Sequence, residues 1–256
     1  MISSINELKK EILQVAFEAK EGHLGSSFSI LDILYVLYNQ VANINKNNLD
    51  RQDRDYIILS KGHASLGHAA VLKNFNFIDN DQLKSYCKFE SILGGHLSKC
   101  SVPGVEVSTG SLGHGTAVSI GIALSSKIRK LDNKIFVIVG DGEINEGTFW
   151  ESLLLASHHK LNNLCFIIDY NRSNDRALKL DPLSKKLKAF GCDVETIDGH
   201  DHVSIEQVLS NDTKSPKSII ANTVKGKGIK RMEHNPEWHH KIPSLEELEM
   251  MLEELS

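Results

Sequence analysis

An aspartate and an asparagine each follow an apolar segment, and thirty residues separate them along the chain. Residues 135–139 (IFVIV) lead into Gly-Asp-Gly at 140–142, and residues 164–169 (LCFIID) lead into Asn171. The spacing from Asp141 to Asn171 accommodates a loop, a helix and a strand, which predicts one β-α-β unit with parallel strands. Parallel strands end at the same edge of a sheet, where open α/β sheets bind ligands. We therefore expect Asp141 and Asn171 to lie together at that edge.

These two side chains offer hard oxygen atoms suited to a divalent cation. Mg²⁺ prefers carboxylate and carbonyl oxygens and commonly takes further ligands from substrate phosphates. The backbone carbonyl of Ser173 is a third candidate ligand, and Gly142 lets the backbone come close to a bulky anion. A buried diphosphate needs such a cation, because unpaired charge is costly to remove from water. A lone Gly-Asp-Gly is most often a simple turn, but its combination with Asn171 favours a magnesium and diphosphate site.

The elements that would position these residues alternate along the chain. Apolar residues at helical spacing predict a helix over residues 5–20, capped by Asn6 or Ser4 and ended by Gly22. Further elements are a helix over 29–39 capped by Ser29, a helix over 147–159, and strands over 56–59, 135–139, 164–169, 194–197 and 218–224. This alternation predicts an α/β fold, a parallel sheet with helices on both faces.

The chain shows no internal repeat and no long Pro/Gly/Ser linker, which favours a single domain over residues 1–256. The acidic segment 245–255 carries leucine and methionine on one face and is interpreted as an amphipathic helix. Such a helix packs on this domain or on a partner, and packing on the domain is the favoured interpretation.

Composition excludes several classes of function. The 256 residues are 41% apolar and 24% charged, with a formal net charge of −4. This charge argues against nucleic-acid binding, which draws on excess Lys and Arg. No segment approaches the roughly 18 apolar residues of a membrane span, and the N-terminus has no apolar signal segment. The four cysteines show no paired spacing. We expect a cytoplasmic protein that binds neither nucleic acid nor membrane.

Motifs in register carry a family resemblance. The run from 140 to 171 resembles the thiamine-diphosphate signature, which begins with GDG and ends with Asn about thirty residues later. Further segments are similar in order and spacing to the amino-terminal domain of transketolases: GHLGSSFSILDILYVLY (22–38), SKGHAS (60–65), GGHLSK (94–99), VEVSTGSLGHG (105–115), IDGHD (197–201) and VKGKGIKRMEHNPEWHHK (224–241). The resemblance implies the thiamine-diphosphate-binding (PP-type) fold and two-carbon ketol transfer from a ketose to an aldose. It also implies thiamine diphosphate and Mg²⁺ as cofactors.

The resemblance also implies roles for individual residues. The metal would be held by Asp141, Asn171 and the carbonyl of Ser173. The cofactor would contact His63, Gly110, Ser111, Leu112, Gly142, Glu143 and Asn171. The active-site histidines would be His23, His63, His96 and His239, with His234 as an alternative to His239. Imidazole suits acid–base work because its pKa lies near 6.5. Glu146 would lie at a subunit interface and join a proton network between two cofactor sites.

Simpler interpretations of these residues remain open. A histidine beside a glycine-rich turn is often satisfied by local backbone, and Glu146 also fits an ordinary acidic residue in the first turn of a helix. Lys61, Lys225 and Lys227 are predicted to be solvated or next to a phosphate. His200 and His202 are predicted to be structural or at the surface.

A complete transketolase continues with a pyrimidine-binding domain and a third domain, whereas this chain ends after the first. We therefore expect the amino-terminal subunit of a split, two-chain transketolase, with a separate carboxy-terminal subunit, in a symmetric heterotetramer. The alternatives are another thiamine-diphosphate-dependent carboligase or decarboxylase of specialised sugar metabolism, or a non-catalytic assembly or regulatory subunit. Leu24, Leu97 and Ser111 stand where the family usually has proline. The sequence therefore leaves open the donor and acceptor sugars and whether they are phosphorylated.

Overall fold

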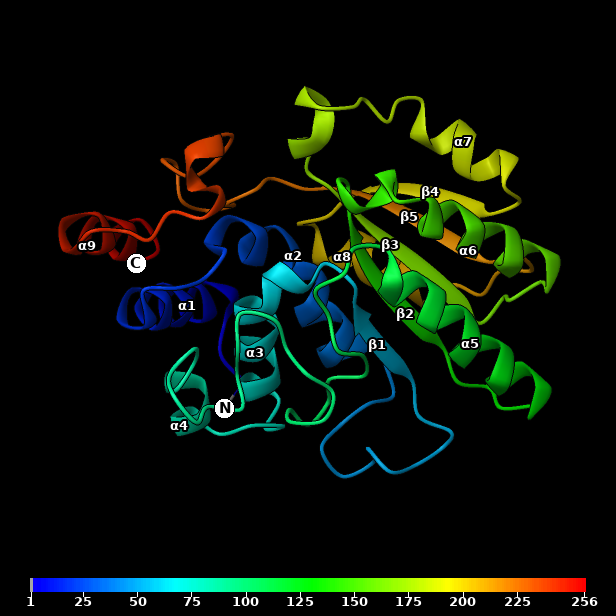
Figure 1. Ribbon diagram of the computed structural model, residues 1–256, viewed down its shortest axis with the longest axis horizontal. Helices are drawn as coiled ribbons and strands as arrows, with labels where there is room; N and C mark the ends of the chain where they lie inside the picture. Colours follow the sequence, from blue (N-terminus) through cyan, green and yellow to red (C-terminus); the bar gives the residue numbers. More distant parts are fainter. Residues whose placement is uncertain (1) are drawn as a thin grey trace.

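A five-stranded parallel sheet forms the centre of the molecule (Figure 1). A computed structural model describes residues 2–256. The strands are β1 (Tyr56–Leu59), β2 (Ile135–Gly140), β3 (Leu164–Tyr170), β4 (Asp193–Asp198) and β5 (Lys217–Asn222). Their order across the sheet is β1-β2-β3-β5-β4, and every neighbouring pair is parallel. The predicted parallel α/β sheet is confirmed, and each predicted strand lies within two residues of its observed bounds.

Alternate strand residues enter two separate apolar cores, as the two-residue period of a strand requires. Phe136 and Ile138 point into one core, and Val137 and Val139 into the other. The first core contains residues of α1 (Ile5–Ala19), α2 (Leu24–Val36), α3 (Ser65–Asn74) and α8 (His202–Ser210). The second contains residues of α5 (His114–Ile128), α6 (Gly147–His158) and α7 (Leu183–Ala189). Helices therefore cover both faces of the sheet, as predicted (Figure 1).

The second helix begins earlier than predicted. α2 starts at Leu24 and not at Ser29, and it continues into a π-helical turn, Leu37–Val41. Ser29 is fully buried inside the helix, and its single hydroxyl hydrogen lies within reach of two acceptors, the Asp169 carboxylate (2.8 Å) and the carbonyl of Ser26 (3.0 Å). The serine predicted to be a helix cap is therefore a buried hydrogen-bond donor.

The first helix has the predicted start and a different end. Ser4 caps α1 through a capping box with Glu7, which resolves the choice between Ser4 and Asn6. Lys20, in the left-handed conformation with φ of 52°, closes the helix. The predicted terminator, Gly22, lies two residues further on in the turn to α2.

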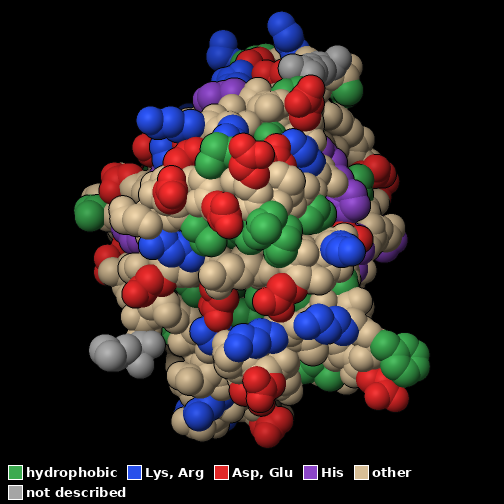
Figure 2. All heavy atoms as spheres, turned by 90° about the vertical axis from the view of Figure 1, so that its left-hand side faces the viewer, with side chains coloured by type: hydrophobic (Ala, Val, Ile, Leu, Met, Phe, Trp, Pro, Cys, Tyr) green, Lys and Arg blue, Asp and Glu red, His purple; other side chains and the backbone are tan. Residues whose placement is uncertain are grey.

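Short helices complete the connections: α4 (Asn80–Lys84) and the 3₁₀ turns Gly62–Ala64, Glu143–Asn145, Ser173–Arg176 and Pro236–His239. The acidic segment forms α9 (Leu245–Glu254), which packs on α1 through the buried side chains of Leu248 and Met251. Figure 2 shows acidic and basic side chains interspersed on the side of the molecule that carries α1 and α9. Within residues 2–256, none of the helices has the length and apolar character needed to cross a bilayer.

Truncation of Met251 tests the packing of α9. Met251 is fully buried, whereas Leu245 on the same helix is 59% exposed. We expect Met251→Ala to lower the free energy of unfolding by about 2–5 kcal/mol, because it leaves a cavity in the core. The matched control Leu245→Ala is expected to change it by less than about 0.5 kcal/mol. Urea unfolding followed by circular dichroism measures both, and equal effects would contradict the packing.

Candidate active site

The carboxyl ends of β1, β2 and β3 open into one cavity. Gly140 at the end of β2 pairs with Asp169 near the end of β3, so the residues after each strand emerge side by side. The cavity has a volume of about 430 Å³. Its lining residues are His23, Ser26, Lys61, His63, Leu112, Gly140, Asp141, Gly142, Glu143, Asn171, Ser173, Asn174, Lys225 and His239. The structure thus brings Asp141, Asn171 and Ser173 to one place, as the strand spacing predicts.

Asp141 presents a buried carboxylate to this cavity. Its Oδ1 accepts a hydrogen bond from the backbone N–H of Gly142 (2.8 Å), and its Oδ2 accepts a long one from the N–H of Asn174 (3.4 Å). Burial, followed by the negative charge of Asp169, raises the pKa of Asp141. A carboxylate that is buried beside a like charge gains from a bound cation, which restores the balance of charge.

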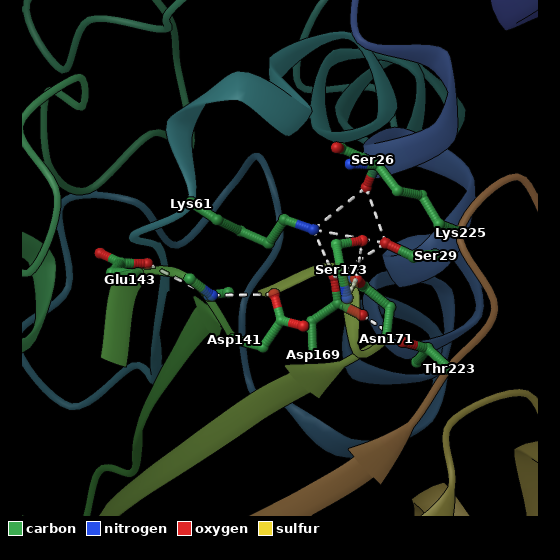
Figure 3. A network of polar contacts seen from close by, with 12 residues as sticks. Ser26, Ser29, Lys61, Asp141, Glu143, Asp169, Asn171, Ser173, Thr223 and Lys225 are labelled. Atoms are coloured by element: carbon green, nitrogen blue, oxygen red, sulfur yellow. Dashed lines mark hydrogen bonds and ion pairs between the residues drawn. The ribbon is translucent and has the colours of Figure 1, made fainter. Parts of the chain in front are cut away.

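The amide of Asn171 has a defined orientation (Figure 3). Its Nδ2 donates to Asp169 Oδ2 at 3.0 Å, so the nitrogen is fixed toward the carboxylate. Its Oδ1 accepts from the backbone N–H of Ser173 at 3.1 Å and from the Ser173 hydroxyl. Because an amide oxygen only accepts and both of its lone pairs face Ser173, a metal ion would bind this atom in exchange for one of those contacts.

A buried ion pair lies next to these two side chains. Lys61 and Asp169 are 1% and 0% exposed, and the Lys61 ammonium contacts Asp169 Oδ2 directly. The hydroxyls of Ser29 (2.8 Å) and Thr223 also donate to the Asp169 carboxylate. Burial alone raises the pKa of Asp169, but Lys61 and these hydrogen bonds outweigh it and hold the pKa below its usual value. The prediction that Lys61 is solvated is wrong, because the side chain is enclosed and paired. Its alternative, a place next to a phosphate, stays a prediction, since Lys61 also lines the cavity.

Glu143 fixes the shape of the cavity wall. Its Oε1 accepts from the backbone N–H of Gly113 (2.8 Å) and from the Ser60 hydroxyl, and its Oε2 accepts from the N–H of Gly140 (3.2 Å). One buried carboxylate thereby ties together the ends of β1 and β2 and the turn at 110–113. Burial raises its pKa.

Three of the predicted histidines gather in the cavity from distant segments. The ring centroid of His23 lies 5.4 Å from that of His63 and 5.6 Å from that of His239. Burial, followed by neighbouring positive groups, lowers the pKa of His23 to about 4 and that of His63 to about 2, and it also lowers the pKa of His239. All three imidazoles are therefore neutral near pH 7. His234 lines an adjoining cavity and not this one, so His239 is the member of the pair that lies beside His23.

Lys225 lies at the boundary between the two cavities and lines both of them. Its ammonium donates to His239 Nδ1 at 2.8 Å. Burial, followed by repulsion from Lys61, lowers the pKa of Lys225 to about 8, while Asp141 and Asp169 oppose the decrease. Lys225 thus remains mostly cationic at neutral pH and faces the same space as Asp141.

Four predicted site residues lie outside the lining of this cavity. His96 is exposed and packs against the turn at Gly62. Gly110 and Ser111 are exposed next to Leu112, and Glu146 is exposed at the N-cap of α6. Their predicted roles remain predictions.

His200 and His202 form a structural cluster with a buried acid. His200 Nδ1 and His202 Nε2 contact the two oxygens of Asp32 at 2.8 and 2.7 Å. His200 Nε2 also accepts from the backbone N–H of Val224 at 2.9 Å. These contacts tie α8 and the segment after β5 to α2, in agreement with the structural interpretation.

A parallel sheet with a polar cavity at its carboxyl edge is typical of α/β proteins that bind a phosphorylated ligand there. The family model described as "Transketolase, thiamine diphosphate binding domain" matches residues 1–252. The chain belongs to the transketolase family.

Individual relatives agree with this membership. The chain is 42% identical over 241 residues to one subunit of the apulose-4-phosphate transketolase of Actinobacillus succinogenes, covering 91% of this chain and 87% of that protein. It is 32% identical over 231 residues to the 6-deoxy-6-sulfo-D-fructose transketolase subunit SqwG of a Clostridium species, covering 87% and 84%. The solved transketolase of Campylobacter jejuni superposes with a TM-score of 0.88 at 29% identity, covering 98% of this chain and 42% of that one.

These findings confirm the predicted family, fold, class of enzyme and thiamine-diphosphate cofactor. They also confirm the resemblance to one chain of a split transketolase, because relatives of comparable length are named as subunits. The chain spans only 42% of the solved transketolase from Campylobacter jejuni.

Substitution of Lys61 tests the buried pair. We expect Lys61→Met to destabilise the fold by about 3–5 kcal/mol at pH 7, because it leaves Asp169 buried without its cation. The double variant Lys61→Met/Asp169→Leu is expected to lose less than the sum of the two single variants. In Lys61→Met the folded-state pKa of Asp169 rises. The loss of unfolding free energy in this variant is therefore largest at neutral pH and becomes smaller as the pH falls toward about 4. Urea unfolding at several pH values measures this, and additive, pH-independent losses would exclude coupling.

Proposed function

We propose that this chain is the diphosphate-binding subunit of a two-chain transketolase, which transfers a two-carbon ketol unit from a ketose to an aldose. The observation that carries the proposal is the convergence of two sets of groups in one cavity of a transketolase-family chain. Asp141, Asn171 and Ser173 supply oxygens on one wall. His23, His63 and His239 supply neutral imidazoles on another.

Mg²⁺ is proposed to bind the Asp141 carboxylate, Asn171 Oδ1 and the carbonyl of Ser173. The donor set fits, because Asp141 is a buried carboxylate beside a like charge and the Asn171 oxygen is oriented by Asp169. The turn at 110–112, together with Gly142 and Glu143, is proposed to lie along the cofactor. Thiamine diphosphate, when bound, supplies the carbon nucleophile that carries the two-carbon unit.

The histidines are proposed to bind the sugar and move protons. A neutral imidazole carries one donor and one acceptor, so each can hydrogen-bond a hydroxyl and exchange a proton with it. His239 receives the Lys225 ammonium on Nδ1, which leaves its Nε2 for the substrate. His96, on the exposed side of the Gly62 turn, is proposed to reach the substrate from the mouth of the cavity.

A second chain is proposed to complete the site with its pyrimidine-binding half. Two relatives are named as transketolase subunits, which supports a separate carboxy-terminal partner. Val118 on α5 and Leu154 and Leu155 on α6 are 43%, 58% and 49% exposed. Exposed apolar side chains on two helices that contact each other support coverage by another chain. Glu146 is the exposed N-cap residue of α6, which supports its proposed place at a subunit interface. A symmetric heterotetramer agrees with these features.

The substrate is proposed to be a sugar or sugar phosphate. Two relatives are named for apulose 4-phosphate and a sulfofructose, both anionic ketoses. Lys225 supplies a cation between the two cavities, which suits such a substrate or the cofactor diphosphate.

We further propose that residues 1–256 form a single domain. The protein is also proposed to be cytoplasmic, and its four free cysteines support this location.

Removal of the Asp141 carboxylate tests the metal site. We expect Asp141→Ala to weaken Mg²⁺-dependent binding of thiamine diphosphate to the two-chain complex by at least roughly 100-fold, because a direct ligand is lost. Its thermal stability without metal is expected to be retained, since a carboxylate with a raised pKa is removed. The matched control Asp132→Ala, an exposed acid before β2, should bind normally. Isothermal calorimetry makes the comparison, and unchanged affinity in Asp141→Ala would refute the assignment.

Reconstitution tests the requirement for two chains. We expect the isolated chain to show no ketol transfer with Mg²⁺, thiamine diphosphate and a panel of ketose phosphates. Addition of the carboxy-terminal subunit is expected to restore it, because the cavity then receives its pyrimidine-binding half. Product formation followed by mass spectrometry, with native mass measurement of the complex, provides the readout. Turnover by the single chain would overturn the proposal.

A further inference from the structure

A second cluster of metal-binding side chains lies at the rim of the active-site cavity. Glu21, His23 and His240 place one ligand atom each within 4.8 Å of one another. Glu21 Oε1 and His240 Nε2 are already joined by a hydrogen bond of 2.7 Å, and the ring centroids of His23 and His240 are 4.5 Å apart. His240 differs from His239 in that it does not line the cavity.

Close backbone packing holds these residues together although they are far apart in the sequence. The N–H of Gly226 donates to the carbonyl of Gly25 at 3.1 Å. A Cβ at Gly25 would lie 3.3 Å from the carbonyl oxygen of Trp238, so a larger residue would push the segment away. Trp238 itself is buried. The turn before α2 and the segment that carries His240 are therefore anchored independently of any bound ion.

The three side chains match the preferences of Zn²⁺. Zinc takes imidazole nitrogen and carboxylate oxygen at about 2.0–2.2 Å, and two histidines with one glutamate form a known three-ligand set that leaves a fourth position open. Tetrahedral ligands at such distances from a metal lie about 3.3–3.6 Å from one another. Ligand atoms up to 4.8 Å apart must therefore approach each other by about 1 Å, while the 2.7 Å contact between Glu21 and His240 opens. Glu21 and His240 are 38% and 52% exposed and can make this adjustment by rotation. Zinc binds a histidine in its neutral form, through the lone pair of one ring nitrogen.

We propose that Glu21, His23 and His240 form a Zn²⁺ site at the rim of the cavity, and that its occupation inhibits the enzyme. Zinc bound there occupies a ring nitrogen of His23, and the side chain of His23 also lines the active-site cavity beside His63. The site is distinct from the proposed magnesium site, which uses oxygen ligands alone. Zinc binding stands without the proposed function, whereas the inhibition rests on it.

Metal titration of the full chain tests the binding. With Mg²⁺ in excess, Zn²⁺ is titrated against a chromophoric chelator, and Co²⁺ is added separately to record its visible absorption. We expect His240→Asn and Glu21→Gln each to weaken Zn²⁺ binding by at least roughly 100-fold and to abolish the Co²⁺ bands of a low-coordinate nitrogen and oxygen site.

Two controls separate this site from other ligands. His234→Asn removes an exposed histidine of the same segment and should leave zinc affinity unchanged. Asp141→Ala removes the proposed magnesium ligand and should also leave zinc affinity unchanged. Wild-type zinc affinity in His240→Asn, or loss of affinity in either control to the same extent, would overturn the site.

Activity of the two-chain complex tests the inhibition. We expect Zn²⁺ to inhibit ketol transfer by the wild type reversibly, with activity restored by a chelator. His240→Asn is expected to keep the basal activity and to raise the inhibitory zinc concentration by at least roughly 100-fold. If the variant loses zinc binding but remains equally inhibited, the inhibitory role is wrong. Absence of ketol transfer from the wild-type complex would instead refute the proposed function and leave the chelator titration decisive for the metal site.

Discussion

The buried ion pair between Lys61 and Asp169 is the interaction on which the geometry of the cavity depends. It joins the segment after β1 to the end of β3, and the Ser29 and Thr223 hydroxyls connect it to α2 and to the segment after β5. Removing two charges from water costs several kcal/mol per ion, and only dense hydrogen bonding of this kind compensates for it. Because Asp169 also accepts from the Asn171 amide, the pair determines which atom of Asn171 can meet a cation.

The strands and the place of the site were predictable from the sequence, because both depend on local patterns. β2 and β3 are buried along their whole length, and their apolar runs are too short for helices. The start of α2 was not predictable in the same way. Twelve of its thirteen residues are buried, so no polar face marks where the helix begins. Ser29 therefore resembled a cap, although its side chain is buried and donates to Asp169.

The partners within the cavity were harder to predict, because they meet only through space. Lys61 in the SKGHAS motif looks like an exposed lysine, and its partner lies 108 residues away. One local signal was available: Asp169 is a charged residue in an otherwise apolar strand, and such a residue requires a counter-charge. The resemblance to transketolases pointed to His23, His63 and His239, but only the fold shows that they are neutral and that His234 lies apart from them.

The same ion pair explains why the cavity suits a ligand that carries both signs of charge. Asp169 contributes to the raised pKa of Asp141, and Lys61 contributes to the lowered pKa of Lys225, in each case after burial itself. Asp141 is therefore repelled by the like charge of Asp169, and Lys225 by the like charge of Lys61. A ligand that places a cation at Asp141 and an anion at Lys225 would offset both repulsions at once, which a lone metal or a lone phosphate cannot do. The metal–diphosphate unit that we propose for this cavity has this distribution of charge, which supports binding of the whole unit over either part alone.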